Sequence, residues 1–213
     1  MSNWIQTGIS LAESKKAIIF LHGRGASAES ILLLASSLDL ADFSIFAPQA
    51  SQHTWYPFGF MASDQGNLSA LNSSLQQVSL LFQFLIENGK APEQIYVMGF
   101  SQGACLSLEF TARNAQKFGG VVAFTGGLIG EKLEEKKYKG DFQGTPILLS
   151  SSAHDMHVPA QRIHDSAQLL QKMGAEVSLT LFEDELHTIR PEELTWVNQR
   201  LFCKVSWFKN PWH

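Results

Sequence analysis

Residues 95–106 read IYVMGFSQGACL, an apolar run that passes through a tight, glycine-containing turn into a second apolar run. The first part is typical of a buried strand and the second of a helix. Gly99, Ser101 and Gly103 match the spacing G-x-S-x-G, in which a serine stands on a sharp strand-to-helix turn with its hydroxyl exposed. Small residues are needed on both sides because the turn brings the strand and helix backbones close together. The segment predicts Ser101 as a nucleophile.

Apolar runs and stretches of helical period alternate on both sides of this turn. Strands are predicted at 17–21, 43–46, 95–100, 121–124, 147–150 and 177–182. Helices are predicted after a cap at Ser27, from Leu68 to Asn88, from Gln102, over about 159–173 and from Pro191. The alternation predicts one α/β domain over residues 1–213, with a mostly parallel central sheet and helices on both faces.

Composition excludes several classes of protein. The 213 residues include 16 Lys and Arg against 20 Asp and Glu, so the chain lacks the excess of basic residues with which proteins bind nucleic-acid phosphates. Apolar runs fall far short of the ~20 residues that a membrane span needs. The N-terminus lacks the pattern of a secretory signal, which predicts a cytoplasmic protein. Cys105 and Cys203 form no C-x-x-C pair, so reduced thiols are expected rather than disulfides or structural zinc.

A serine hydroxyl needs a neighbouring imidazole to take its proton. In this architecture the order along the chain is Ser, then Asp or Glu, then His, and catalytic groups lie at the carboxyl ends of strands. His187 follows the strand predicted at 177–182 and precedes Pro191, so it is the predicted base. His164 falls inside a predicted helix and His213 is the last residue, and both are interpreted as surface groups.

The imidazole in turn needs a carboxylate to fix its tautomer. Asp155 follows the strand predicted at 147–150 and is favoured over Asp184, which is only three residues from His187. The cluster His154-Asp155-Met156-His157 also permits an alternative, a metal site. No fourth ligand is evident nearby in the sequence, so we predict no metal and interpret His157 as a loop residue packed near the site.

Acyl transfer also needs two donors for the developing oxyanion. The backbone amide of Gln102, directly after the nucleophile, is one predicted donor. The turn His22-Gly23-Arg24-Gly25 follows an early strand, and the amide of Arg24 is the predicted second donor. His22 precedes Ser101 in the chain, and a structural role in the turn is favoured over a role as base.

Residues 53–61, HTWYPFGFM, place aromatic side chains in a loop. Trp55, Tyr56 and Phe58 are candidates for the lining of an acyl pocket, because pockets are mainly apolar and loops carry specificity. The alternative is an aromatic loop packed onto the scaffold. The aromatic residues near the C-terminus, Trp207, Phe208 and Trp212, either pack back on the body or form a homodimer contact, and the sequence leaves both open.

Several of these segments together resemble the phospholipase/carboxylesterase family of α/β-hydrolases. They are LHGRG at 21–25, AP at 47–48, GFSQGA at 99–104, Asp155 before Val158-Pro159, and HTI at 187–189. The resemblance runs from about residue 16 to the end. It implies an α/β-hydrolase fold without a large lid, no cofactor, and hydrolysis of small-molecule carboxylic esters or thioesters by the residues named above.

The chain departs from the family pattern at two positions. The family usually has glycine directly before the catalytic histidine and commonly has glycine three residues before the aspartate, where this chain has Leu186 and Ser152. Two alternatives to a serine esterase therefore stay open. One is an idle α/β-hydrolase fold that binds a small ligand, and the other is a metal-assisted hydrolase. Within the serine mechanism, ester, thioester and lysophospholipid substrates share one machinery, so the sequence does not separate them.

Overall fold

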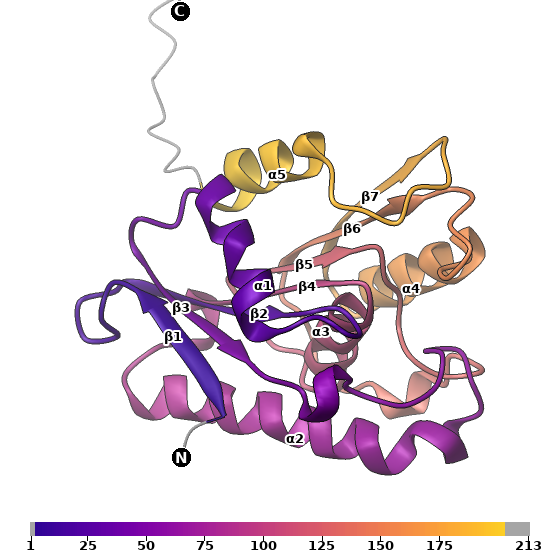
Figure 1. Cartoon of the computed structure of the whole chain (residues 1–213), viewed down its shortest axis with the longest axis horizontal. Helices are drawn as coiled ribbons and strands as arrows, with labels where there is room; N and C mark the ends of the chain where they lie inside the picture. Colours follow the sequence, from indigo (N-terminus) through magenta and orange to yellow (C-terminus); the bar gives the residue numbers. More distant parts are fainter. Residues whose placement is uncertain (1–2, 203–213) are drawn as a thin grey trace, which may run out of the picture.

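A computed structural model describes residues 3–202, which form one twisted sheet flanked by helices (Figure 1). The strands are β1 (Trp4–Gly8), β2 (Lys16–Leu21), β3 (Phe43–Pro48), β4 (Ile95–Phe100), β5 (Gly120–Phe124), β6 (Pro146–Ser152) and β7 (Glu176–Phe182). The helices are α1 (Ala28–Leu32), α2 (Asp64–Glu87), α3 (Gln102–Arg113), α4 (Ala160–Lys172) and α5 (Pro191–Val197). The predicted α/β fold class, with a mostly parallel sheet, is confirmed.

The order of strands across the sheet is β1-β3-β2-β4-β5-β6-β7. All neighbouring strands are parallel except β1, which pairs antiparallel with β3 at the edge. Helices cover both faces, so the interior strands are buried on both sides and read as continuous apolar runs. Because parallel strands end at the same edge, the loops that follow β2, β4, β6 and β7 gather there.

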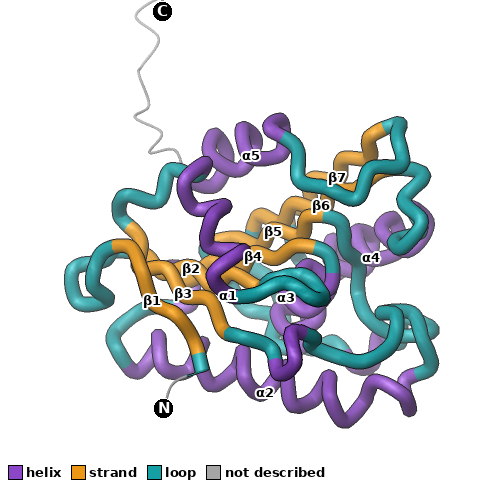
Figure 2. Tube along the Cα trace, viewed as in Figure 1, coloured by secondary structure: helices purple, strands orange, loops and turns teal. Residues whose placement is uncertain are grey.

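Helices lie on both sides of the sheet (Figure 2). The apolar core accordingly has two layers of side chains, one on each face of the sheet. Strand β2 shows how the sequence builds both: Ile19 and Leu21 face α2 and α3, whereas Ile18 and Phe20 face α1 and α5. Successive side chains of a strand point to opposite faces, so a strand buried on both sides needs apolar residues at every position. This rigid sheet fixes where each loop begins.

Three elements differ from the sequence-based expectation. Strand β1 was not predicted, and it forms by adding to the exposed edge of β3 rather than by a strong pattern of its own. The helix expected after Ser27 is shorter, because α1 gives way to a 3₁₀ turn over Leu33–Ser37 and Leu38 is already extended. The last helix changes to a π-helical turn over Asn198–Phe202.

None of the helices within residues 3–202 is both long and apolar enough to cross a membrane. Cys203 and the aromatic residues at 207, 208 and 212 lie outside the described residues. The homodimer contact stays a prediction, and so does the cytoplasmic location.

Candidate active site

Ser101 lies on the turn between β4 and α3 in a strained conformation, with φ 54° and ψ −119°. Its backbone N–H donates to the carbonyl of Phe124 at 2.9 Å. The neighbouring glycines are required by contact: a Cβ on Gly99 would lie 2.2 Å from the carbonyl oxygen of Gly103, and a Cβ on Gly103 would lie 2.0 Å from that of Leu21. The sequence therefore dictates a turn that holds the serine hydroxyl out of the sheet edge.

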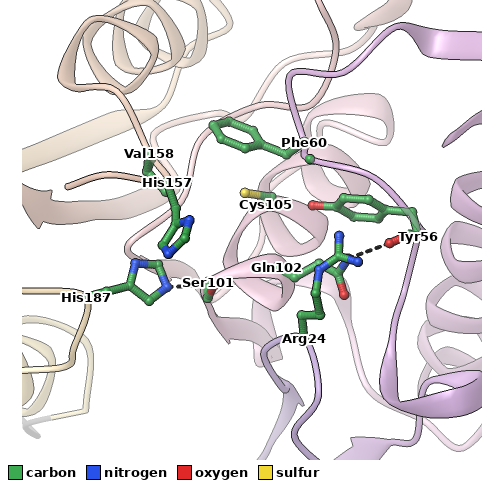
Figure 3. Close-up of a pocket in the computed structure, with 10 residues that line it drawn as sticks. Arg24, Tyr56, Phe60, Ser101, Gln102, Cys105, His157, Val158 and His187 are labelled. Atoms are coloured by element: carbon green, nitrogen blue, oxygen red, sulfur yellow. Dashed lines mark hydrogen bonds between the residues drawn. The ribbon is translucent and has the colours of Figure 1, made fainter. Parts of the chain in front are cut away.

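His187 lies in the loop between β7 and α5 and reaches the serine (Figure 3). Its Nε2 is 2.8 Å from the Oγ of Ser101. The ring packs beside Phe100 and meets His157 edge to face, with centroids 5.3 Å and 5.2 Å away. About a quarter of the His187 side chain is exposed, so the ring can be reached from solvent.

Asp155 lies in the loop after β6 and holds the other side of the imidazole. Its Oδ2 is 2.7 Å from Nδ1 of His187, and the carboxylate is fully buried. Its Oδ1 accepts the backbone N–H groups of His157 and Val158 at 2.7 and 2.9 Å. An ionised carboxylate only accepts hydrogen bonds, so Nδ1 of His187 carries the proton and Nε2 is left to accept from Ser101. The structure thus brings together the three residues that the sequence singled out.

The residues considered for a metal site and the alternative carboxylate, Asp184, lie in other arrangements. The side chain of His154 turns outward to Glu183, 3.7 Å away, while Asp155 points to His187. Within residues 3–202, no group of three or more His, Cys, Asp or Glu side chains is arranged to hold a metal ion. Asp184 does not contact His187, and its Oδ1 instead accepts a hydrogen bond from Arg190 at 2.6 Å.

The turn over residues 22–25 lies directly against the serine. A Cβ on Gly23 would be only 3.5 Å from Cβ of Ser101, so the turn and the elbow are in contact. In the part of the chain that the structure describes, the backbone amides of Arg24 and Gln102 donate no hydrogen bond. Gln102 is also the first residue of α3, where the helix dipole favours negative charge. These two amides are available for an anionic oxygen beside Ser101.

The side chain of His22 holds this turn in place by hydrogen bonds, which confirms the structural role expected for His22. The ring is fully buried: Nδ1 lies 2.7 Å from the carbonyl of Gly23, and Nε2 accepts the N–H of Ala50 at 3.1 Å. Nδ1 is therefore the protonated nitrogen. Burial lowers the pKa of His22, which keeps the imidazole neutral and suited to these two contacts.

The side chain of Gln102 has a second role that the sequence did not reveal. Its Nε2 donates to the carbonyl of Tyr56 at 2.8 Å (Figure 3). Its Oε1 accepts the N–H of Trp55 at 2.9 Å. The side chain of Arg24 holds the next part of the same loop, donating to the carbonyls of Pro57 and Phe58 at 2.7 and 2.6 Å. Two residues predicted for their amides also fasten the aromatic loop to the site.

A cavity of about 270 Å³ opens beside Ser101. Its lining residues are Arg24, Tyr56, Gly59, Phe60, Ser101, Gln102, Cys105, His157, Val158 and His187. Of the three aromatic candidates, Tyr56 lines this cavity, whereas Trp55 and Phe58 do not. Trp55 is buried and donates through Nε1 to the carbonyl of His22 at 2.8 Å, and the exposed ring of Phe58 packs over Gly66.

Phe60, Cys105 and Val158 are lining residues that the sequence did not identify. Phe60 belongs to the same aromatic segment, but nothing in that segment distinguishes inward from outward side chains. Cys105 lies one helical turn after Ser101, and burial raises its pKa to about 11. A neutral thiol is a poor nucleophile, so Cys105 contributes an apolar wall, in keeping with its interpretation as a small buried residue.

The chain matches known proteins over most of its length. Residues 8–203 match the family model described as phospholipase/carboxylesterase. A probable carboxylesterase SOBER1-like protein of Arabidopsis thaliana is 25% identical over 89% of this chain and 80% of its own length. Acyl-protein thioesterase 1 of Saccharomyces cerevisiae is 26% identical over 90% of this chain and 94% of its own. The crystal structure of a phospholipase/carboxylesterase from Dyadobacter fermentans superposes with a TM-score of 0.94 at 44% identity, covering 95% and 97% of the two chains.

Proposed function

Since this chain belongs to the phospholipase/carboxylesterase family, we propose that it is a serine hydrolase that cleaves carboxylic esters through Ser101, His187 and Asp155. The observation that carries the proposal is the continuous line of hydrogen bonds from the Ser101 hydroxyl through the imidazole to the buried carboxylate. Such a line makes an otherwise weak nucleophile reactive, because the proton has an acceptor at the moment of attack.

In the proposed reaction the Oγ of Ser101 attacks the carbonyl carbon of the ester and His187 Nε2 takes the hydroxyl proton. The tetrahedral intermediate places a negative charge on the former carbonyl oxygen, which the amides of Arg24 and Gln102 bind. His187 then returns the proton to the leaving alcohol, and an acyl group remains on Ser101. Water, activated by the same imidazole, releases the acid. Losing one such oxyanion donor typically lowers kcat by ~10²–10³.

Asp155 acts on His187 rather than on the substrate. With Oδ1 held by two backbone N–H groups, its Oδ2 stays directed at Nδ1 and stabilises the imidazolium that forms during attack. Asp155→Asn presents an amide that can reverse the tautomer of His187. The serine proteases that serve as the general example of this effect lose about 10⁴ in kcat, and we expect a loss of similar order here.

The size of the cavity supports esters with small acyl groups as the preferred substrates. At about 270 Å³ it is slightly smaller than the ~300–1,000 Å³ found for ligand pockets. Phe60, Cys105 and Val158 give it apolar walls suited to a short hydrocarbon chain. A long-chain acyl thioester or a lysophospholipid would need more room, so a carboxylesterase is favoured over a thioesterase or a lysophospholipase with the same three residues.

Two measurements test the proposal. A fluorophosphonate probe is expected to label the wild type at Ser101, located by mass spectrometry, and to leave Ser101→Ala unlabelled. Hydrolysis rates are then compared for p-nitrophenyl acetate, butyrate and octanoate, a palmitoyl thioester and a lysophospholipid, with the two shortest esters expected to be fastest. Absence of both labelling and turnover would favour a ligand-binding protein with an idle site. Activity lost to a strong chelator would favour a metal-assisted reaction.

A further inference from the structure

A second polar cluster, outside the three proposed catalytic residues, joins the loop that carries Asp155 to the loop that carries His187. We propose that Ser152, Asp184 and Arg190 form a clamp that sets the orientation of His187, and that they are positioning residues for the ester hydrolysis proposed above, on which the inference rests. None of the three touches Ser101 or the cavity beside it. Their contacts converge on the residue directly before the imidazole.

Asp184 is the centre of the clamp. Its Oδ1 accepts the backbone N–H of Leu186 at 2.9 Å and a hydrogen bond from Nη2 of Arg190 at 2.6 Å. The Leu186 N–H, followed by the Ser152 hydroxyl and then Arg190, holds the pKa of Asp184 below its ordinary value, so the carboxylate stays ionised and accepts hydrogen bonds. The backbone carbonyl of Asp184 also accepts the N–H of His154, which ties this loop to the neighbour of Asp155.

Ser152 ends strand β6 and is fully buried. Its Oγ lies 2.5 Å from the carbonyl oxygen of Leu186 and 2.7 Å from Oδ1 of Asp184, and it accepts from Nη2 of Arg190 at 2.7 Å. Both polar backbone groups of Leu186 are therefore held. The N–H donates to Asp184, and the carbonyl accepts from the Ser152 hydroxyl, whose single proton it shares with Oδ1 of Asp184, and from Nη2 of Arg190 at 3.4 Å. That carbonyl belongs to the peptide bond that leads into His187, so the clamp fixes the direction in which the imidazole leaves the backbone.

Arg190 connects the clamp to α5. Its guanidinium stacks over the ring of Phe182 at 4.2 Å and is 9% exposed, and its backbone N–H donates to Oε2 of Glu193 at 2.5 Å. The guanidinium itself is held between the ring of Phe182 and Oε2 of Glu193, which lies 3.9 Å from Nη1, so Nη2 presents a fixed donor to Ser152 and Asp184. These contacts link the end of β6, the loop that carries His187 and the start of α5.

The two departures from the family pattern meet in this clamp. Glycine before a catalytic histidine leaves the backbone free, whereas Leu186 restricts it, and the hydroxyl of Ser152 contacts the carbonyl of that same leucine. Ser152 and Leu186 thus act as a pair: one residue supplies the hydrogen bond and the other presents the constrained backbone that receives it. The geometry at His187 is obtained by hydrogen bonds where glycine would supply conformational freedom.

The experiment compares full-length Asp184→Asn and Ser152→Ala with Glu183→Gln, a matched control that removes a carboxylate from the adjacent, exposed position. Each variant is followed by the rate constant and endpoint of fluorophosphonate labelling, by kcat and KM for p-nitrophenyl butyrate, by melting temperature and by the downfield proton resonance of His187 Nδ1. A misplacement of about 1 Å costs on the order of 100-fold in rate, so we expect kcat to fall by about 10-fold to 100-fold in the clamp variants.

The clamp also predicts an unchanged labelling endpoint, a nearly unchanged KM and a shifted resonance, with Glu183→Gln like the wild type in all of these. Labelling rates and a resonance equal to those of the wild type would overturn the clamp. The clamp would also be overturned if the labelling endpoint of a variant fell in proportion to its loss of folded protein, because that result would indicate a purely structural role. If the wild type shows the resonance but is never labelled, the proposed hydrolase is refuted. In that case a resonance that is shifted in the variants would still support the clamp.

Discussion

The side chain of Gln102 gives a sharp test of how this site is assembled, because its amide N–H and its side chain have separate tasks. Gln102→Ala keeps the backbone donor at the start of α3 but removes both contacts to the aromatic loop. The N–H of Trp55 is then buried without its acceptor, whereas the carbonyl of Tyr56 keeps a hydrogen bond from the hydroxyl of Thr54 at 3.0 Å. The two losses are therefore unequal.

The magnitude follows from these contacts. An unsatisfied buried donor costs about 1–3 kcal/mol, and the lost hydrogen bond to Tyr56, whose carbonyl remains paired, costs about 0.5–1.5 kcal/mol. Together they predict a loss of about 1.5–4.5 kcal/mol in the free energy of unfolding. For a chain of this size each kcal/mol lowers the melting temperature by about 2–4 °C, so the expected decrease is roughly 3–18 °C.

The assay is thermal unfolding by circular dichroism, with p-nitrophenyl butyrate hydrolysis measured on the folded variant. Because the backbone amide remains, we expect KM to rise as the wall formed by Tyr56 loosens, and kcat to change less. Gln83→Ala, at an exposed position of α2, serves as the control. A Gln102→Ala protein that melts like this control would refute the reasoning, and a fall in kcat at constant KM would show that the side chain acts on the transition state.

Gly103→Ala would place a Cβ 2.0 Å from the carbonyl oxygen of Leu21, so the backbone must move, and urea unfolding is expected to show a loss of about 3 kcal/mol in the free energy of unfolding. Gly59→Ala, whose Cβ would meet nothing within 4 Å, is the control, and equal stability of the two variants would contradict the close approach. Burial raises the pKa of Glu193, so this group contributes stability that is complete below its unfolded pKa near 4.5 and is lost as pH rises through the folded pKa. Melting curves between about pH 4 and about pH 7 should therefore show Glu193→Gln gaining on the wild type as pH increases, and a trend in the opposite direction would mean that the carboxylate is stabilised in the fold. Cys105, with a pKa of about 11, should resist iodoacetamide near pH 8 in the folded protein and react after unfolding, as measured by mass spectrometry of its peptide. Rapid alkylation of the native thiol would show that Cys105 is not the buried neutral group described above.

The sequence contained enough to predict the sheet and the elbow, because both rest on local rules. Strands buried on two faces must be apolar at every position, as β4 is, and a turn in which Gly103 nearly touches Leu21 admits no side chain. The same locality explains the failures. Strand β1 depends on a free edge of β3, which leaves no clear pattern in its own residues. After α1 the chain becomes extended at Leu38, whose side chain joins the core on that face of the sheet, and this contact is with residues distant in the sequence.

For the site, chain order and strand ends were sufficient to choose His187 and Asp155, since parallel strands bring their carboxyl ends to one edge whatever the loops contain. The direction of a loop side chain has no such rule. Trp55, Tyr56 and Phe58 are neighbours of similar character, yet one is buried against His22, one lines the cavity and one lies in solvent. Their placement comes from hydrogen bonds to residues far away in the chain, such as Gln102, and the clamp on Leu186 arises in the same way. Periodicity and turn chemistry act over a few residues and can be read from the sequence, whereas the pairing of distant polar groups exists only once the sheet has brought them within about 3 Å of one another.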